Sequence, residues 1–280
     1  MDYLWNGTDL MSAIQQMMVG SGGGGVTLMS ALTTASLTTN LKLCLDAGDV
    51  SSYDPSVQTD KWLDRSGAGY DFYRGSGTGS DAADPTFTGS AGVLGSYWEF
   101  DGGDYFTYDA ANEVWMNSIH KNSAIFSMVL FYYPTLGTYE LVGDSAAGTG
   151  FQFINNGEVN FQVDNAGATA LLVTGDSSVS DNAYHMAGIS LNEATGAGGG
   201  FMYLDGSYNQ IGGSNTFDST YSSPSAANAS HTLQIAANGN AGLPAKASSR
   251  LACIAIWQGT ALTKANMDTI FAAMRGRFSI

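Results

Sequence analysis

The pattern most suggestive of chemistry is a pair of carboxylates at alternate positions of a strand-like stretch. Glu99 and Asp101 follow Trp98, so in an extended strand their side chains would leave the same face of a sheet. Glycoside hydrolysis requires such a pair, one acting as acid and the other as nucleophile or base. Gly102 and Gly103 come next and favour a turn, in which Asp101 would bind backbone amides. We therefore predict that the protein is not an enzyme.

Aspartates near the predicted turns offer a second chemistry, the binding of a cation. Ca²⁺ prefers oxygen ligands, and 25 acidic against 10 basic residues give a net charge of −15. The candidate calcium ligands are Asp46, Asp49, Asp101 and Asp104. The sequence lacks an EF-hand loop, so we favour the alternative, in which these aspartates cap turns. No cofactor is expected, with calcium as the open alternative.

Aromatic residues in and beside glycine-rich loops offer a third chemistry, the binding of carbohydrate. Aromatic rings mixed with small polar residues suit an adaptable binding surface. The candidate ligand-binding residues are Tyr70, Tyr73, Tyr97, Tyr105, Tyr108 and Trp115. The alternative is that most of them pack in the interior.

The histidines and cysteines show no catalytic or metal-binding pattern. His120, His185 and His231 lack both a Ser-His-Asp order and the spacing of a metal site. We expect His185 to be packed and hydrogen-bonded within a strand. Cys44 and Cys253 lie in separate apolar runs, so we expect both to be buried and reduced.

The composition limits the class of partner. Apolar residues make up 44% of the chain, which is enough for a substantial core, and charged residues only 12%. The negative net charge repels phosphate backbones, so nucleic acid is not an expected partner. No apolar run is long enough to cross a bilayer, and Met1–Tyr3 lack the positive charge of a signal peptide. We expect no membrane insertion.

The first forty residues differ from the rest of the chain. Apolar residues recur at helical spacing from Leu10 to Met18, glycines 22–25 form a break, and a second short helix is expected from Leu28 to Ala35. A short helix needs a packing partner, which is either its own domain or another subunit or protein. We favour the second alternative and assign residues 1–40 to attachment or oligomerisation, and residues 41–280 to one domain.

From Leu41 onward the apolar pattern is that of β-strands. Leu41–Leu45 alternates, and Ile125–Tyr133 is a near-continuous apolar run that Pro134 ends. Asn156-Gly157 and Asp205-Gly206 indicate hairpin turns. Thr263 is a good N-cap for a closing helix. The pattern predicts an all-β fold, an antiparallel two-sheet sandwich, with a helical N-terminal segment and a C-terminal helix.

Several motifs, in their order, resemble one family. They are Leu-Lys-Leu-Cys-Leu-Asp-Ala-Gly at 41–48, Trp-Leu-Asp-Arg-Ser-Gly at 62–67, Trp-Glu-Phe-Asp-Gly-Gly-Asp-Tyr at 98–105, Tyr-His-Met-Ala at 184–187 and Phe-Met-Tyr-Leu-Asp-Gly at 201–206. Together they resemble the concanavalin A-like lectin/glucanase, or laminin-G-like, domains of bacteriophage structural proteins, across residues 41–280. The resemblance implies a jelly-roll sandwich whose first and last strands are neighbours, which would bring Cys44 near Cys253. The glucanases of this superfamily carry an E-x-D-x-x-E pattern, whose last position is Asp104 here.

The resemblance also implies a function. We expect a virion structural protein, a tail or head fibre or a capsid decoration, assembled in the host cytoplasm. Residues 1–40 would bind other virion proteins or form a homo-oligomer, and the sandwich would bind a host-surface glycan. The alternatives are a glycan-degrading enzyme using Glu99 and Asp101, and a purely structural module.

Overall fold

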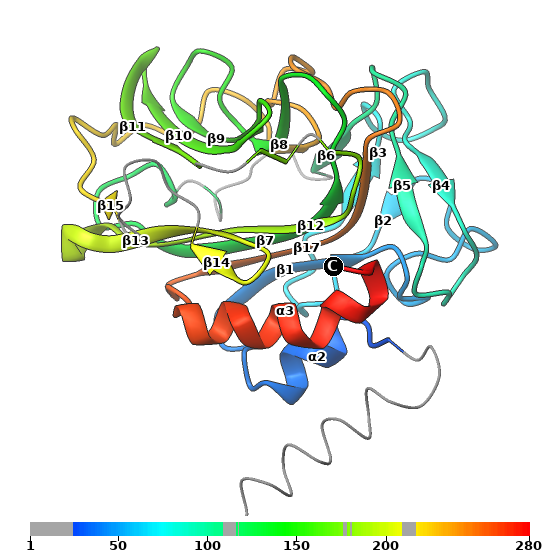
Figure 1. Ribbon diagram of the computed structural model, residues 1–280. Helices are drawn as coiled ribbons and strands as arrows, with labels where there is room; N and C mark the ends of the chain where they lie inside the picture. The colour runs from blue at the N-terminus through cyan, green and yellow to red at the C-terminus, as the bar shows by residue number, and fades with distance from the viewer. Residues whose placement is uncertain (1–24, 109–115, 117, 176–177, 180, 209–216) are drawn as a thin grey trace, which may run out of the picture.

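The protein is an antiparallel β-sandwich with two helices on its outer side (Figure 1). The computed structural model describes residues 25–108, 116, 118–175, 178–179, 181–208 and 217–280. Within these residues one sheet has nine strands and the other has eight. The predicted fold class, an all-β two-sheet sandwich of the jelly-roll type, is therefore confirmed.

Each sheet gathers strands from distant parts of the chain. The larger sheet contains β1 (Leu41–Asp46), β4 (Thr86–Thr88), β5 (Tyr97–Glu99), β7 (Ile125–Tyr133), β12 (His185–Asn192), β13 (Ala197–Leu204), β14 (Ser207–Tyr208), β15 (Phe217–Asp218) and β17 (Arg250–Gln258). Their order is β14-β13-β12-β7-β17-β5-β4, with β1 also paired to β17 and β15 to β13. The smaller sheet contains β2 (Lys61–Trp62), β3 (Phe72–Arg74), β6 (Phe106–Tyr108), β8 (Tyr139–Gly143), β9 (Gly150–Asn155), β10 (Val159–Asn165), β11 (Ala168–Thr174) and β16 (Gln234–Ile235). Its order is β11-β10-β9-β8-β16-β6-β3-β2.

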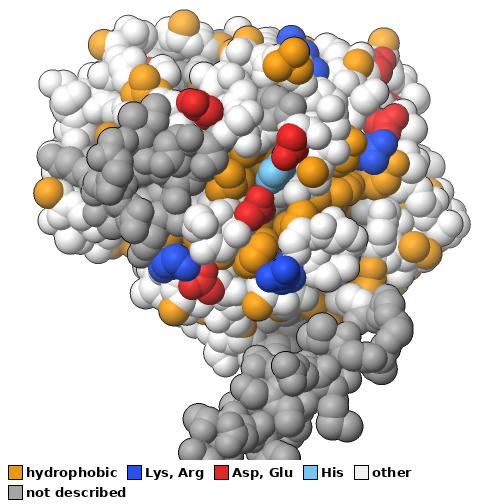
Figure 2. Space-filling model, in the orientation of Figure 1, with side chains coloured by type: hydrophobic (Ala, Val, Ile, Leu, Met, Phe, Trp, Pro, Cys, Tyr) orange, Lys and Arg blue, Asp and Glu red, His pale blue; other side chains and the backbone are white. Residues whose placement is uncertain are grey.

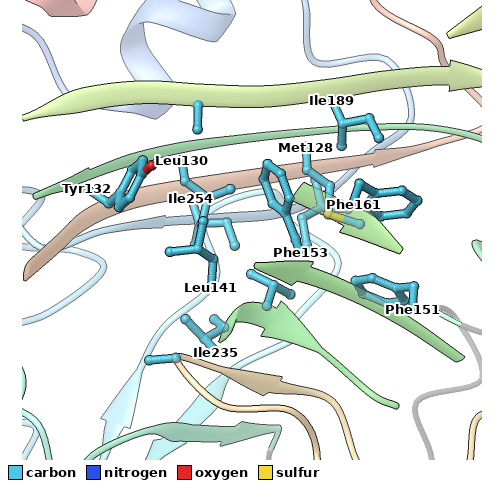
Figure 3. Close-up of a cluster of buried hydrophobic side chains, with 14 of the residues drawn as sticks. Met128, Leu130, Tyr132, Leu141, Phe151, Phe153, Phe161, Ile189, Ile235 and Ile254 are labelled. Atoms are coloured by element: carbon cyan, nitrogen blue, oxygen red, sulfur yellow. The ribbon is translucent and has the colours of Figure 1, made fainter. Parts of the chain in front are cut away.

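The main core fills the space between the two sheets. Alternation along β7 turns Met128 and Leu130 inward, where they meet Phe153 and Phe161 of the smaller sheet (Figure 3). These side chains are fully buried. Each buried side chain of this size contributes about 1.5–3 kcal/mol, so this layer dominates the stability of the sandwich.

A second core covers the outer face of the larger sheet. Val129 and Phe131 point outward from β7, which explains why this strand carries apolar residues on both of its faces. They are covered by α2 (Leu28–Thr34) and α3 (Lys264–Phe278), which lie on the same side of the sheet (Figure 1). We call this layer the outer-face core. No helix within the described ranges is long and apolar enough to span a membrane.

Residues 25–40 belong to the folded body. Leu28 and Leu32 of α2 are fully buried in the outer-face core, and the Leu37 carbonyl accepts a hydrogen bond from the Trp257 indole at 2.7 Å. The short helix from Leu28 is therefore confirmed, and it packs on its own domain. The helix expected from Leu10 to Met18 lies outside the described residues, and the attachment role of residues 1–40 stays a prediction.

The first and last strands of the sandwich are neighbours, as the resemblance implied. β1 pairs antiparallel with β17, with Cys44 opposite Ala255 and Cys253 opposite Asp46. The two thiols are diagonal neighbours on the outer face, and both are buried and free. The prediction of reduced core cysteines is confirmed.

Candidate functional site

A group of aromatic and charged side chains lies on the outer face of the larger sheet, near the C-terminus of α3. The Arg250 guanidinium lies between two tyrosine rings, 4.6 Å from the ring centre of Tyr97 and 4.7 Å from that of Tyr133. The Tyr184 ring packs edge-on against Tyr133, with 5.5 Å between ring centres. All four residues are partly exposed. We call Tyr97, Tyr133, Tyr184 and Arg250 the tyrosine patch.

The alternation of β7 and the length of α3 together create this surface. Phe131 points outward and is covered by Phe278, the last residue of α3, with 4.9 Å between the stacked rings. Tyr133 points to the same side two residues further along β7, beyond the end of the helix. Tyr184 fills part of the gap and contacts Phe278 at 5.0 Å between ring centres. The patch is thus the uncovered end of the outer-face core.

The charges of the patch are partly compensated. Arg250 Nε donates to Glu99 Oε2 at 3.1 Å, and these side chains are 30% and 38% exposed. An ion pair this exposed adds little to stability, so both groups keep hydrogen-bonding capacity toward a ligand. Burial raises the pKa of the Tyr184 hydroxyl, and Arg250 opposes that shift only in part, so the phenol stays protonated and able to donate. The patch therefore offers ring surface, donors and an acceptor together.

His185 lies at the start of β12, directly after Tyr184, and joins two aspartates. Its Nδ1 is 2.6 Å from Asp205 Oδ2, and its Nε2 is 2.9 Å from Asp181 Oδ1. Burial lowers the pKa of His185, but the hydrogen bonds and charges of Asp205 and Asp181 outweigh burial and raise it. Figure 2, a view onto the side of the sandwich, shows a histidine between two acidic side chains beside a band of hydrophobic side chains. The sequence prediction of a packed, hydrogen-bonded histidine is confirmed.

The interior behind the patch leaves little room for a ligand. A cavity lined by Tyr132, Tyr139, Ser249 and Arg250, among others, has a volume of about 10 Å³. That is the space of about one water molecule. A larger ligand at this end of the molecule would therefore bind on the surface.

The structure separates the aromatic residues proposed from sequence. Tyr97 belongs to the tyrosine patch, whereas Tyr70 and Tyr108 pack together at 5.8 Å beside the main core. Tyr105 and Tyr108 are buried, so little of either ring is open to a ligand. Tyr73 lies on β3 beneath the Lys61 ammonium, 4.7 Å from its ring centre. Trp115 lies outside the described residues.

The proposed calcium ligands do not form one site either. Asp46 accepts hydrogen bonds from the Leu28 and Gly48 amides and from both Arg277 Nη atoms, at 2.7–2.8 Å. These bonds occupy the four acceptor positions of the carboxylate, so Asp46 holds neighbouring parts of the chain together. Among the residues that the structure describes, no three His, Cys, Asp or Glu side chains are grouped to hold a metal ion.

The other candidate aspartates bind neighbouring parts of the chain. Asp49 pairs with Arg65 at 3.4 Å. Asp101 accepts from the Gly103 amide at 2.9 Å, and Asp104 accepts from the Asp101 amide at 2.8 Å. Burial raises the pKa of Asp104 to about 6, because little water and a nearby carboxylate disfavour its ionised form. The interpretation of Asp101 as a turn-bonding residue is confirmed.

Glu99 and Asp101 do not continue one strand. β5 ends at Glu99, whose carboxylate is held by Arg250, and Asp101 lies in the following turn. The strand alternation that would place both carboxylates on one face therefore stops between them.

Three residues of the patch were missed by the sequence reasoning. Tyr133 and Arg250 stand at the end of β7 and the start of β17, and they meet because these strands pair antiparallel. Tyr184 directly precedes β12. A signal was present, since each residue is a large polar-tipped side chain at the boundary of an apolar run. Many strand ends carry such a residue, and only the strand pairing shows which of them meet at one place.

Comparison with known proteins shows the fold. No family model and no curated protein matches this sequence. A structure of botulinum neurotoxin type C, whose cell entry depends on interaction with two ganglioside molecules, superposes with a TM-score of 0.56 at 12% identity over 86% of this chain and 53% of that chain. The botulinum neurotoxin type G receptor binding domain gives 0.52 and 12%, over 83% and 51% of the two chains.

A Trypanosoma rangeli sialidase in complex with sialic acid is also similar, with a TM-score of 0.51 and 14% identity over 84% of this chain and 33% of that chain. The chain thus spans about half the length of the similar toxin structures and a third of the sialidase. At these identities the likeness shows a shared β-sandwich fold and carries no residue roles.

Proposed function

We propose that this chain is an adhesion protein that binds a surface glycan through the tyrosine patch. The observation that carries the proposal is the juxtaposition of three partly exposed tyrosine rings with Arg250 and Glu99 on one open face. Ring faces pack on sugar rings, and charged groups at the edge exchange hydrogen bonds with hydroxyls. The described similarity to a ganglioside-dependent toxin and a sialidase supports a glycan as the ligand class.

The setting that we propose is a bacteriophage virion, as a tail or head fibre or a capsid decoration assembled in the host cytoplasm. The motifs resembling phage structural domains and the glycine run ahead of the folded body support this setting. Residues 1–24 would attach the body to other virion proteins or to sister subunits. Several copies on one particle would turn weak glycan binding into useful avidity.

We further propose binding rather than catalysis. The two carboxylates with the best glucanase-like spacing, Glu99 and Asp101, are engaged by Arg250 and by a turn amide. β5 ends at Glu99 and Asp101 lies in the following turn, so strand alternation does not set the spacing of the two carboxylates as a catalytic pair.

A glycan array with matched variants tests the ligand proposal. We expect the intact chain to bind a subset of glycans, and Tyr133→Ala to weaken that binding by about tenfold, which corresponds to about 1.4 kcal/mol. Tyr73→Ala is the control, because Tyr73 is a partly exposed tyrosine beside a cation on the other sheet. Loss of binding in Tyr73→Ala with retention in Tyr133→Ala would contradict the assignment, and an array without binding would contradict the ligand class.

A further inference from the structure

We infer that His185 forms a pH-dependent contact, which in the charged form of the imidazole holds the segment Asp181–Tyr184 against the tyrosine patch. We call this contact the latch. The latch concerns the regulation of the proposed glycan site, so its consequence for binding rests on the proposed function. The effect of His185 on the position of the segment does not rest on the proposed function.

The geometry requires the charged form of the imidazole. Its two ring nitrogens face carboxylate oxygens, Asp205 Oδ2 at 2.6 Å and Asp181 Oδ1 at 2.9 Å. An ionised carboxylate only accepts hydrogen bonds, so both nitrogens must donate. Only the imidazolium carries a proton on each nitrogen.

The surroundings of the imidazole favour that form. The titratable groups that face it are Asp181 from the segment ahead of β12, Asp205 from the β13–β14 turn, and Tyr132 of β7, whose ring centre is 6.3 Å away. The two carboxylates raise the pKa of His185 against the effect of burial. Burial raises the pKa of Asp181, but the hydrogen bond and charge of His185 and the Ala183 amide together outweigh burial and lower it.

Loss of the proton to solvent breaks one particular bond. Asp205 is additionally held by the Met186 amide at 2.7 Å, and its side chain is 28% exposed against 54% for Asp181. The remaining proton therefore stays on Nδ1, toward Asp205. The Nε2 lone pair then faces Asp181 Oδ1, and the repulsion turns the more exposed Asp181 carboxylate into water.

Release of Asp181 affects the patch through Tyr184. This residue ends the released segment, and its ring is the contact between Tyr133 and Phe278. The sign follows from the pKa directions: a raised His185 pKa stabilises the latched state below the ordinary histidine value, and that stabilisation is lost as pH rises through the folded value. The lowered Asp181 pKa keeps the latch closed in acid until Asp181 itself protonates.

Two measurements on the intact chain, without any glycan, test the latch. We expect an NMR titration of ¹³C-labelled histidine to place His185, assigned with His185→Gln, above the ordinary value of about 6.5. Amide exchange in residues 181–186, corrected for its intrinsic pH dependence, should speed up by about tenfold or more across the same titration, as expected for loss of a charge-assisted hydrogen bond.

The variants separate the latch from simple packing. Asp181→Asn, at an exposed carboxylate, should lower the His185 titration point and remove the pH dependence of exchange, while His231→Gln should leave both unchanged. A His185 titration point at or below the ordinary value, or exchange in residues 181–186 independent of pH, would overturn the latch. Neither readout depends on a ligand, so failure of glycan binding leaves this test intact.

Discussion

Asp46 joins three segments of the chain at one buried point. Its carboxylate accepts from the Leu28 amide at the start of α2, from the Gly48 amide after β1, and from Arg277 in the last turn of α3. Arg277 and Asp46 are 1% and 0% exposed, so the pair is screened from water. The residue that the sequence suggested as a calcium ligand thus fixes both helices to the sheet.

Removing the Arg277 charge leaves a buried carboxylate without its counterion. We expect Arg277→Met to lower the free energy of unfolding by about 3–5 kcal/mol in urea denaturation. Arg250→Met is the matched control, because the Arg250–Glu99 pair is partly exposed and should cost about 1 kcal/mol or less. Equal effects of the two substitutions would contradict the structural role given to the buried pair.

Glu140 on β8 makes the stability depend on pH. Its side chain is fully buried, and burial raises the pKa of Glu140 well above its ordinary value, which the Phe153 amide offsets only in part. In the unfolded chain this group ionises near pH 4.3, whereas in the folded chain it ionises only at a higher pH. The free energy of unfolding therefore falls as pH rises above that value.

Replacing Glu140 with the neutral residue glutamine removes this pH-dependent loss of stability. We expect Glu140→Gln to exceed the parent chain in stability by an amount that grows from pH 4.5 to pH 8, as measured by urea denaturation at each pH. Glu158→Gln, on the β9–β10 turn, serves as the control and should show no such growth. A stability difference that is constant across this range would show that Glu140 ionises normally in the folded protein.

Local sequence patterns predicted the strands, turns and helix caps that depend on neighbouring residues. Alternation located β1, and an apolar run located β7. Asp205-Gly206 forms the expected tight turn between β13 and β14, and Thr263 caps α3 as expected. Glycine commonly ends a helix, yet α3 continues past Gly276 to Phe278. The helix continues because Phe278 stacks on Phe131 and Arg277 reaches Asp46, contacts that the local sequence does not contain.

The boundary of the folded body is also set by tertiary contacts. Leu28 and Leu32 of α2 are fully buried, and each contributes about 1.5–3 kcal/mol. We expect a chain lacking residues 1–40 to be destabilised by several kcal/mol, whereas a chain lacking residues 1–24 should keep the thermal stability of the parent. Equal melting temperatures for both truncations would contradict the packing of α2. A test of virion incorporation should use the chain lacking residues 1–24, because this truncation leaves the folded body intact.

At the scale of the molecule, the site depends on pairing that the sequence does not state. Tyr97, Tyr133 and Arg250 come from three strands, and β17 brings them together by pairing with both β5 and β7. Composition and loop aromatics predicted the kind of residue, and of the residues they named Tyr97 lies in the patch. The sequence did not indicate the other patch residues, because a tyrosine in the core and a tyrosine on the surface cannot be distinguished before the strand pairing is known.

The proposed glycan site lies on one face of one sheet. The most direct test of that location is backbone amide chemical-shift mapping on the intact, isotope-labelled chain, titrated with the glycan that the array selects. We expect the shifted amides to cluster at Tyr97, Tyr133, Tyr184 and Arg250. Shifts confined to the smaller sheet, around Tyr73 and Thr107, would contradict it.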